Sequence, residues 1–204
     1  MLVLARHGNT FDPGDKVTWI GARSDVPLAS KGRAQAHAMA AYLESVGIRP
    51  DCFIAGPLRR TREFAEIVAH KFERDIVIDH RLREIDYGTW EGLTSAEIDA
   101  SSGGNLLIEW QEYLLWPQFG VWRDRESTVV ERVRSFLMHM HRRWLDQPRT
   151  TFACTSNGIA RLARHILDGA RSPDDTKMQT GALSVLEATA DGWQIRVWNE
   201  RPQS

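Results

Sequence analysis

The sequence has few of the features that mark secreted or membrane proteins. Only two cysteines occur in its 204 residues, Cys52 and Cys154, and each lies inside an apolar run. So few cysteines argue against a disulfide framework and favour buried thiols in a reducing compartment. No apolar stretch approaches the ~18 residues of a membrane-spanning helix, and Arg6 interrupts the first apolar run too early for a secretory leader. We therefore expect a soluble, cytoplasmic protein without a membrane partner.

Excess charge and clustered metal ligands are also lacking. The formal net charge is −1, so no bulk basic field favours nucleic acid, and any anion site must be local. His139 and His141 are two residues apart on a predicted helix and face different directions, so they predict no metal site. We expect neither a metal nor a cofactor.

Apolar runs alternate with amphipathic segments along the chain. Strands are predicted at 2–5, 52–55, 76–78, 151–155, 183–188 and 193–198, and helices at about 30–47, 57–72, 127–144 and 159–167. This alternation predicts an α/β three-layer sandwich, and the Asp191-Gly192 hairpin signal at its end makes the mostly parallel sheet mixed. Without repeats or linkers, residues 1–204 are expected to form a single domain.

Three local features refine this picture. The first helix is expected to begin with Ser30 as its cap and to bury a face made of Ala34, His37, Ala38, Ala41 and Tyr42. Residues 8–29 read as a long functional loop. Residues from about 94 to 126 read as a cap insertion, opened by a capping box of Thr94 and Glu97.

The chemistry begins where the first strand ends. Leu2-Val3-Leu4-Ala5 delivers Arg6-His7-Gly8 to a loop, and ligands bind at the carboxyl ends of strands in open parallel sheets. An imidazole there can act as a nucleophile, and a guanidinium can hold an anion in a fixed fork. Together they predict a phosphate-ester site.

Three further segments place polar residues at such ends. Arg59 and Arg60 lie near a helix N-terminus, which favours anions. Glu84 lies in an aromatic-rich loop, where burial would raise the pKa of its carboxyl group and suit it to donate a proton. Asn157 and Gly158 follow another strand. Glu91 competes with Glu84 for the role of acid.

In this order the motifs resemble those of the histidine phosphatase superfamily, also called phosphoglycerate mutase-like. The matching segments are Arg6-His7-Gly8-Asn9-Thr10; Asp25-Val26-Pro27-Leu28 with Gly32 and Gln35; Pro57-Leu58-Arg59-Arg60-Thr61; Glu84 with Tyr87-Gly88-Thr89-Trp90-Glu91-Gly92; and Glu126-Ser127. The resemblance implies the family's fold. It also implies a metal-independent phosphatase that hydrolyses a small phosphate monoester through a phosphohistidine.

The resemblance also assigns roles to residues. His7 would be the nucleophile and Glu84 the proton donor, with Arg6 and Arg60 on the phosphoryl oxygens. Asn157 and Gly158 complete the predicted phosphate site. Further candidates for substrate contact are Asn9, Thr10, Gly21, Glu126 and Ser127.

One departure from the family pattern stands out. The family usually carries a second histidine in a Ser-His-Gly-Gly segment, and here that position is Asn157. An amide donates a hydrogen bond but carries no charge. We therefore expect phosphate binding with slower turnover, or turnover of esters with an easier leaving group.

Other interpretations remain open. A phosphoglycerate mutase shares the first half-reaction, and a non-catalytic phospho-ligand binding module would tolerate Asn157. Cys154 and Arg161 are separated by six residues rather than the five of cysteine phosphatases, so a buried cysteine is favoured. Trp90, Trp110, Trp116 and Trp122 are candidates to line a pocket, and the edge strands permit a homodimer.

Overall fold

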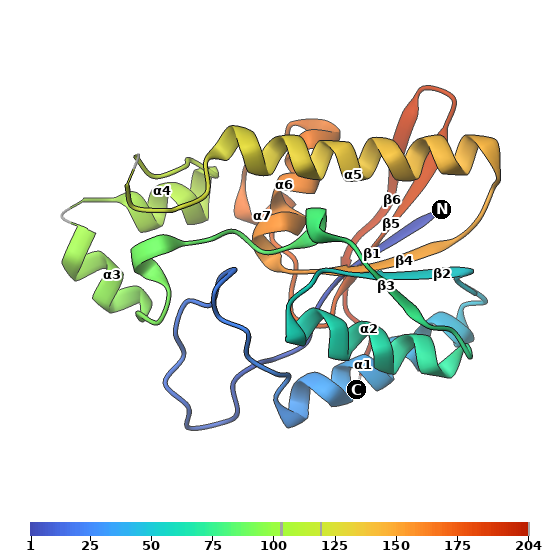
Figure 1. Cartoon of the computed structure of the whole chain (residues 1–204), viewed down its shortest axis with the longest axis horizontal. Helices are drawn as coiled ribbons and strands as arrows, with labels where there is room; N and C mark the ends of the chain where they lie inside the picture. The colour runs from blue at the N-terminus through green and yellow to red at the C-terminus, as the bar shows by residue number, and fades with distance from the viewer. Residues whose placement is uncertain (103, 119, 204) are drawn as a thin grey trace.

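The computed structural model describes residues 1–102, 104–118 and 120–203 and is an α/β three-layer sandwich (Figure 1). Residues 103 and 119 of the predicted cap, and residue 204, lie outside the described residues. The elements in chain order are β1 (Leu2–Arg6), α1 (Ser30–Ser45), β2 (Cys52–Ala55), α2 (Arg59–Lys71), β3 (Ile76–Ile78), η1 (His80–Leu82), η2 (Gly88–Trp90), α3 (Ser95–Ser102), α4 (Leu106–Tyr113), α5 (Glu126–Asp146), β4 (Thr151–Thr155), α6 (Asn157–Asp168), α7 (Pro173–Thr176), β5 (Leu183–Thr189) and β6 (Gly192–Glu200).

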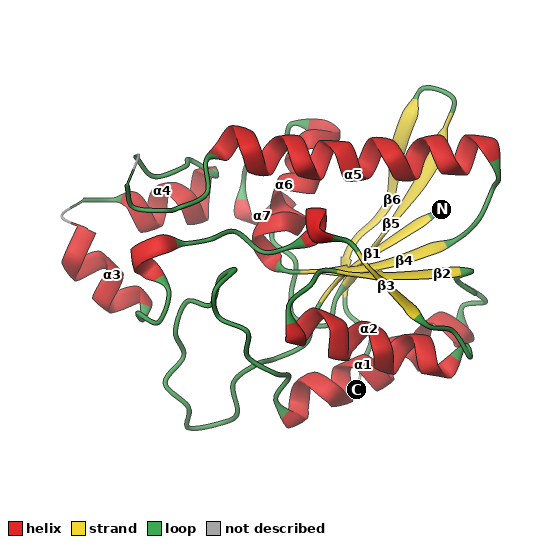
Figure 2. Ribbon diagram, in the orientation of Figure 1, coloured by secondary structure: helices red, strands yellow, loops and turns green. Residues whose placement is uncertain are grey.

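The six-stranded sheet has the order β3-β2-β4-β1-β5-β6 (Figure 2). β1, β2, β3 and β4 pair in parallel, and β5 runs antiparallel to both of its neighbours. The expectation of a mostly parallel mixed sheet is confirmed. Because β2, β4 and β1 are adjacent, the loops that follow them meet at one edge of the sheet.

β1 shows why the sheet needs helices on both faces. Leu2 and Leu4 pack into the core cluster that contains residues of α5 and α6, whereas Val3 and Ala5 pack into the cluster under α1 and α2. Successive strand side chains point to opposite faces, so a strand that is apolar throughout requires a helical layer on each side. Figure 1 shows these two layers, with α1 and α2 below the sheet and α5 and α6 above it.

The prediction for the buried face of α1 was wrong. The helix buries Gly32, Gln35, Ala36, Met39, Ala40 and Leu43, while His37 is exposed. Alanines lie on every side of this helix, so the sequence pattern marked its face only weakly. Gly32 is buried because its α-carbon passes against the backbone of Asn9, where a β-carbon would lie 2.1 Å from the Asn9 carbonyl oxygen.

Several helix starts also differ from prediction; α2, for example, begins at Arg59 rather than at about residue 57. Ala29 rather than Ser30 is the N-cap of α1, without a side-chain capping bond. α6 begins at Asn157, two residues earlier than expected, with Ser156 as its N-cap. Asn157 and Gly158 therefore belong to the first turn of a helix, and the amide of Gly158 is free to bond outside it.

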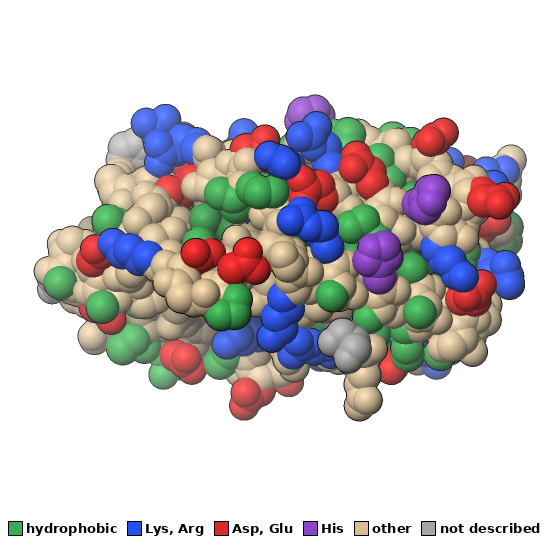
Figure 3. Space-filling view, turned by 90° about the horizontal axis from the view of Figure 1, so that it is seen from below, with side chains coloured by type: hydrophobic (Ala, Val, Ile, Leu, Met, Phe, Trp, Pro, Cys, Tyr) green, Lys and Arg blue, Asp and Glu red, His purple; other side chains and the backbone are tan. Residues whose placement is uncertain are grey.

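The predicted capping box is present at α3. The backbone amide of Thr94 donates to Glu97 Oε2 over 2.7 Å, and the amide of Glu97 donates to Thr94 Oγ1 over 3.2 Å. α3 and α4 extend beyond the sheet at one end of the molecule (Figure 1). On the face seen in Figure 3, basic and acidic side chains are interspersed, which agrees with the small net charge.

Candidate active site

A cavity of about 520 Å³ opens at the carboxyl end of β1. The long loop after this strand supplies most of the lining, and the rest comes from residues near the starts of α1, α3 and α6, from the segment of Glu84 and Tyr87, and from Thr180. The lining residues are Arg6, His7, Asn9, Thr10, Phe11, Asp12, Pro13, Val17, Thr18, Trp19, Ile20, Lys31, Glu84, Tyr87, Ser95, Asn157 and Thr180. Six of the residues singled out in the sequence thus share one cavity, namely Arg6, His7, Asn9, Thr10, Glu84 and Asn157.

His7 presents one ring nitrogen as a lone pair. Its Nδ1 lies 2.8 Å from the carbonyl oxygen of Gly8 and donates to it. Its Nε2 lies 3.2 Å from Nε of Arg60 and accepts a hydrogen bond from it. Burial, followed by the charges of Arg60 and Arg6, lowers the pKa of the imidazole well below its ordinary value. A neutral ring with a fixed tautomer is the form that can attack phosphorus.

Arg60 is fully buried and is held by two backbone carbonyls. Nη1 donates to the Ser24 carbonyl oxygen over 2.6 Å, and Nη2 donates to the Gly21 carbonyl oxygen over 3.1 Å. Arg59 instead pairs with Glu63 on the exposed side of α2, over 2.7 Å. The loop of residues 8–29 therefore fixes the guanidinium that faces His7.

Arg6 supplies the second cation. Its Nη1 donates to the Met178 carbonyl oxygen over 2.6 Å, while Nε is buried without a hydrogen-bond partner in the described part of the chain. Burial lowers the pKa of Arg6 to about 10, so the group still carries its charge near neutrality. A buried donor without a partner, in the same cavity as the His7 imidazole, is ready to bond an anion.

Glu84 lines the same cavity and is 4% exposed. Its Oε1 accepts from the amide of Ile85 over 2.9 Å, and Oε2 accepts from the amide of Gly158 over 3.2 Å. Burial raises the pKa of the carboxyl group, although both hydrogen bonds and the charges of Arg60 and Arg6 oppose the shift. A raised pKa keeps this carboxyl group protonated to higher pH than an ordinary one, which suits it to donate a proton to a bound oxygen.

The first turn of α6 packs against this carboxyl group. Asn157 Oδ1 accepts from the amide of Met178 over 3.2 Å, which leaves the side-chain NH₂ as its donor toward the cavity. A β-carbon on Gly158 would lie 2.5 Å from the Tyr87 hydroxyl oxygen and 2.6 Å from Glu84 Oε1. Glycine is therefore required for the close approach of Glu84 and Tyr87 to the helix.

The structure separates the predicted substrate contacts into three groups. Asn9 and Thr10 line the cavity, and Asn9 Oδ1 accepts from Thr180 Oγ1 over 2.8 Å. Gly21 lies behind the wall, where its carbonyl holds Arg60. Glu126 and Ser127 are exposed at the start of α5, and neither is among the residues that line the cavity.

Sequence reasoning missed Tyr87, Lys31 and Thr180. Tyr87 lies three residues after Glu84, and its buried hydroxyl has a pKa raised well above the ordinary value by burial and by the Glu84 charge. That position within the acid-bearing segment was an available signal. Lys31 and Thr180 belong to none of the motifs identified in the sequence.

The tryptophans mostly pack on one another. Trp90, Trp110 and Trp122 are buried, and Trp122 contacts both of the others edge-on at 5.2 and 4.9 Å between ring centroids. Trp19 lines the cavity and packs edge-on against Trp90 of this cluster. None of the four tryptophans predicted to line a pocket is among the residues that line this cavity, but Trp116 and Trp122 line a separate, smaller one of about 170 Å³.

Cys154 is fully buried in β4, and burial raises the pKa of its thiol well above the ordinary value. Arg161 donates to the carbonyl oxygens of Trp110 and Gln111 over 3.2 and 2.7 Å. These two residues do not form a cysteine-phosphatase cradle, in agreement with their spacing.

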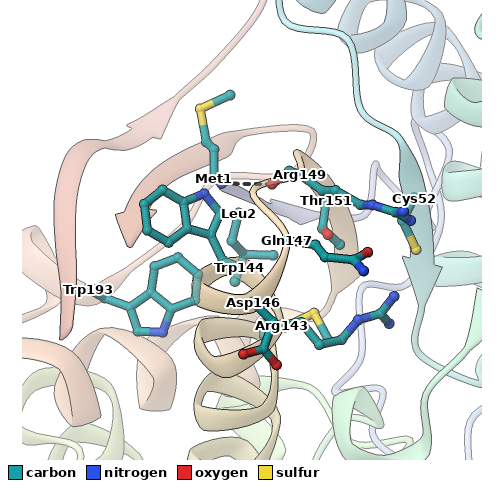
Figure 4. Close-up of a pocket in the computed structure, with 11 residues that line it drawn as sticks. Met1, Leu2, Cys52, Arg143, Trp144, Asp146, Gln147, Arg149, Thr151 and Trp193 are labelled. Atoms are coloured by element: carbon teal, nitrogen blue, oxygen red, sulfur yellow. Dashed lines mark hydrogen bonds between the residues drawn. The ribbon is translucent and has the colours of Figure 1, made fainter. Parts of the chain in front are cut away.

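A second cavity, of about 190 Å³, lies at the other end of the sheet near the start of β1 (Figure 4). There the amino group of Met1 donates to the Arg149 carbonyl oxygen over 2.9 Å, and Trp144 and Trp193 form part of the wall. Its lining includes no histidine. Across the described ranges, no His, Cys, Asp and Glu cluster is placed to hold a metal, and no helix is long and apolar enough to cross a membrane.

Comparison with known proteins identifies the family. The sequence model of the histidine phosphatase superfamily (branch 1) matches residues 2–201. A glucosyl-3-phosphoglycerate phosphatase of Mycobacterium tuberculosis is 36% identical over 221 residues, covering 99% of this chain and 95% of that protein. A probable phosphoglycerate mutase, GpmB of Escherichia coli, is 40% identical over 88 residues, covering 43% of this chain and 39% of its own length.

The fold comparison agrees. A mycobacterial glucosyl-3-phosphoglycerate phosphatase in complex with VO3 superposes with a TM-score of 0.80 at 25% identity, covering 97% of this chain and 98% of that one. The chain therefore belongs to the histidine phosphatase superfamily and is a phosphoric monoester hydrolase that works through a phosphohistidine.

Proposed function

We propose that His7 is the nucleophile, Glu84 the general acid and base, and Arg6 and Arg60 the phosphoryl clamp of this hydrolase. One observation carries the assignment: the Nε2 lone pair of His7 and the buried carboxyl group of Glu84 line the same cavity. Asn157 and Gly158 are proposed to complete the phosphate site from the first turn of α6.

In the first half-reaction, the Nε2 lone pair of His7 attacks phosphorus and the ester P–O bond breaks. The proton of Glu84 passes to the leaving oxygen, so the alcohol departs neutral. Arg60 Nε, which rests on His7 Nε2 in the free enzyme, transfers its hydrogen bond to a phosphoryl oxygen. Arg6 Nε gains the partner that it lacks.

In the second half-reaction, water attacks the phosphohistidine and the P–N bond breaks. Glu84, now a carboxylate, takes the proton from that water, and the electron pair returns to Nε2 of His7. Inorganic phosphate leaves, and Glu84 is again protonated for the next cycle.

Asn157 is proposed to stand where relatives of this family place a second histidine. With Oδ1 bound to the Met178 amide, its NH₂ group can donate to a phosphoryl oxygen but brings no charge. Loss of one transition-state donor costs about 2.7–4 kcal/mol, and an amide recovers part of that. We therefore expect phosphoryl transfer to be slower than in a site with two histidines.

The substrate class proposed is a phosphate monoester whose alcohol part carries a carboxylate, as in a phosphoglycerate or its glycoside. Lys31 lines the cavity, and its ammonium has no hydrogen bond or ion pair within the described residues. Asn9, Thr10 and Thr180 offer polar contacts to hydroxyl groups, and Trp19 offers an apolar wall. The Mycobacterium tuberculosis relative, named for glucosyl-3-phosphoglycerate, supports this class.

The test is phosphate release from 3-phosphoglycerate, glucosyl-3-phosphoglycerate and p-nitrophenyl phosphate in the presence of EDTA, with His7→Ala as control. ³²P trapping on wild-type protein should give an acid-labile label that His7→Ala lacks. A protein that binds orthovanadate but neither turns over nor labels would be a binding module. Isomerisation of 3-phosphoglycerate dependent on a bisphosphate primer would indicate a mutase instead.

A further inference from the structure

The position of Arg60 depends on a short piece of the long loop. All three guanidinium nitrogens donate inside the protein: Nε to His7, Nη1 to the Ser24 carbonyl and Nη2 to the Gly21 carbonyl. The segment of residues 21–24 therefore aims the guanidinium at His7. Whatever fixes this segment also fixes the cation at the nucleophile.

Glu91 is the side chain that binds this segment most extensively. Its Oε2 accepts from Ser24 Oγ over 2.7 Å and from the backbone amide of Arg23 over 3.2 Å. Its Oε1 lies 3.4 Å from the same amide and 3.8 Å from Arg23 Nε. Both carboxylate oxygens thus face Arg23 and Ser24, the last two residues of the segment whose Gly21 and Ser24 carbonyls hold Arg60.

The close approach of Glu91 to residues 21–24 requires a glycine at position 21. A β-carbon at this position would lie 2.4 Å from Glu91 Oε1 and 2.7 Å from the Ile85 carbonyl oxygen. The Ile85 carbonyl accepts from the amide of Ala22 over 2.9 Å, which ties the same segment to the chain next to Glu84. Only glycine leaves room for both contacts.

Glu91 itself stays away from the reacting groups. Its side chain is 5% exposed, and it is not among the residues that line the cavity with His7. Its negative charge nevertheless acts on Arg60, because it is one of the carboxylates that favour the charged guanidinium. The geometry is that of a support and not of a proton donor.

We propose that Glu91 is a positioning residue for phosphoryl transfer, which holds residues 21–24 so that their carbonyls aim Arg60 at His7 and at the bound phosphoryl group. The proposal rests on the proposed role of Arg60 as a phosphate clamp. It also gives a separate task to the carboxylate that competes with Glu84 in the sequence.

The test compares Glu91→Ala and Glu91→Gln with a matched control, Glu63→Ala. Glu63 also binds the backbone of the long loop, through the amide of Leu28 over 2.9 Å, but it contacts neither Ser24 nor Arg23. Glu91→Ala should lower kcat/KM about 10- to 100-fold, the range expected when a catalytic group is misplaced by up to ~1 Å. It should weaken orthovanadate binding in parallel, and Glu91→Gln should restore part of both.

A second readout needs no turnover. Arg60 is one cause of the lowered pKa of His7, so its displacement should raise the His7 pKa, which ¹⁵N-histidine NMR follows directly. A merely structural loss would lower the unfolding midpoint without moving that pKa in the remaining folded protein. If the wild-type enzyme shows no phosphatase activity, the proposed function fails, and the NMR titration still decides whether Glu91 positions Arg60.

The measurements on these variants decide between a positioning role and a merely structural role of Glu91. The proposal stands if Glu91→Ala raises the His7 pKa and weakens vanadate binding while Glu63→Ala does neither. It is overturned if folded Glu91→Ala leaves both unchanged, or if Glu63→Ala changes both equally. Should Glu91→Ala fail to fold, Ser24→Ala removes the 2.7 Å bond alone, and an unchanged His7 pKa in that variant overturns the proposal.

Discussion

Arg60 Nε donates to His7 Nε2 over 3.2 Å, so the clamp rests directly on the nitrogen proposed to attack phosphorus. In the free enzyme this bond keeps the imidazole in one tautomer and opposes its protonation. In the proposed mechanism, the same donor exchanges the ring nitrogen for a phosphoryl oxygen when the substrate binds. The one interaction would then hold the neutral imidazole in the free protein and free its lone pair when an anion binds.

The pH dependence of the reaction should reflect Glu84 more than His7. Burial and the charges of Arg60 and Arg6 lower the pKa of His7 well below its ordinary value, so protonation of the ring is not expected to limit the reaction near neutral pH. The pKa of Glu84 is raised, so the acid is protonated at low pH and is lost as pH rises through that raised value. We expect kcat/KM for an alkyl phosphate to fall on the alkaline side.

Glu84→Gln tests this assignment. The variant should lose about 10²- to 10⁴-fold in rate on an alkyl phosphate, because the poor leaving group needs the proton. The first step with p-nitrophenyl phosphate should suffer less, since nitrophenolate leaves unprotonated. Two results would contradict this role of Glu84. One is an equal loss of burst-phase rate on the alkyl and the nitrophenyl substrates, and the other is a kcat/KM that still falls at alkaline pH in the variant.

Asn157→His should raise kcat about tenfold. A protonated imidazole would place a charged donor at the first turn of α6, where the amide now offers a neutral one. Single-turnover kinetics separates the phosphoryl transfer from product release. A kcat that is unchanged or lower would mean that the asparagine does not limit turnover.

The residues proposed to do the chemistry could be predicted from the sequence because they follow short apolar strands. β2 and β4 have the predicted boundaries, since Cys52–Ala55 and Thr151–Thr155 are apolar runs between polar turns. β4 lies between β2 and β1, and this parallel order brings Arg6, Arg60 and Asn157 to one edge of the sheet. Because parallel strands end at the same edge of the sheet, motifs that are far apart in the sequence come together in one site.

Features that depend on packing between distant parts of the chain could not be predicted from the sequence. The buried face of α1 depends on Gly32 meeting the backbone of Asn9, and an alanine-rich helix gives little pattern to choose that face. Thr180 reaches Asn9 across 171 positions of the chain. The place of Glu126 and Ser127 outside the cavity follows from where α5 starts, which no local motif specifies.

Gly158→Ala should abolish most activity with little loss of fold. The added β-carbon would lie 2.6 Å from Glu84 Oε1 and 2.5 Å from the Tyr87 hydroxyl, so the carboxyl group must move. A displacement of ~1 Å is expected to cost about 100-fold in kcat. Urea unfolding checks the fold, and activity near the wild-type level would show that Glu84 need not stay in place.

Lys31→Met should raise KM for a carboxylate-bearing ester and leave p-nitrophenyl phosphate unaffected. A solvent-exposed ion pair contributes up to about 1 kcal/mol, which is roughly fivefold in KM. Lys16→Met is the matched control, because Lys16 pairs with Glu97 over 2.8 Å and is not among the cavity-lining residues. Equal effects of the two variants, or of Lys31→Met on both substrates, would argue against a carboxylate contact.

Arg161→Met should destabilise the protein without touching the reaction. Arg161 is 3% exposed and joins α6 to α4 and α7 through the carbonyls of Trp110 and Gln111 and the hydroxyl of Thr176. Methionine keeps the apolar stem but leaves these groups without their donor, at a cost of about 3 kcal/mol in the free energy of unfolding.

Arg164→Met, on the same helix, provides the comparison. Arg164 forms an i,i+4 pair with Asp168 at the surface, so its loss should cost less than about 1 kcal/mol. Urea denaturation of both variants measures the difference, and kcat at low temperature should stay near wild type for each. If Arg161→Met proved no more destabilising than Arg164→Met, the buried guanidinium would not be what holds α4 against α6.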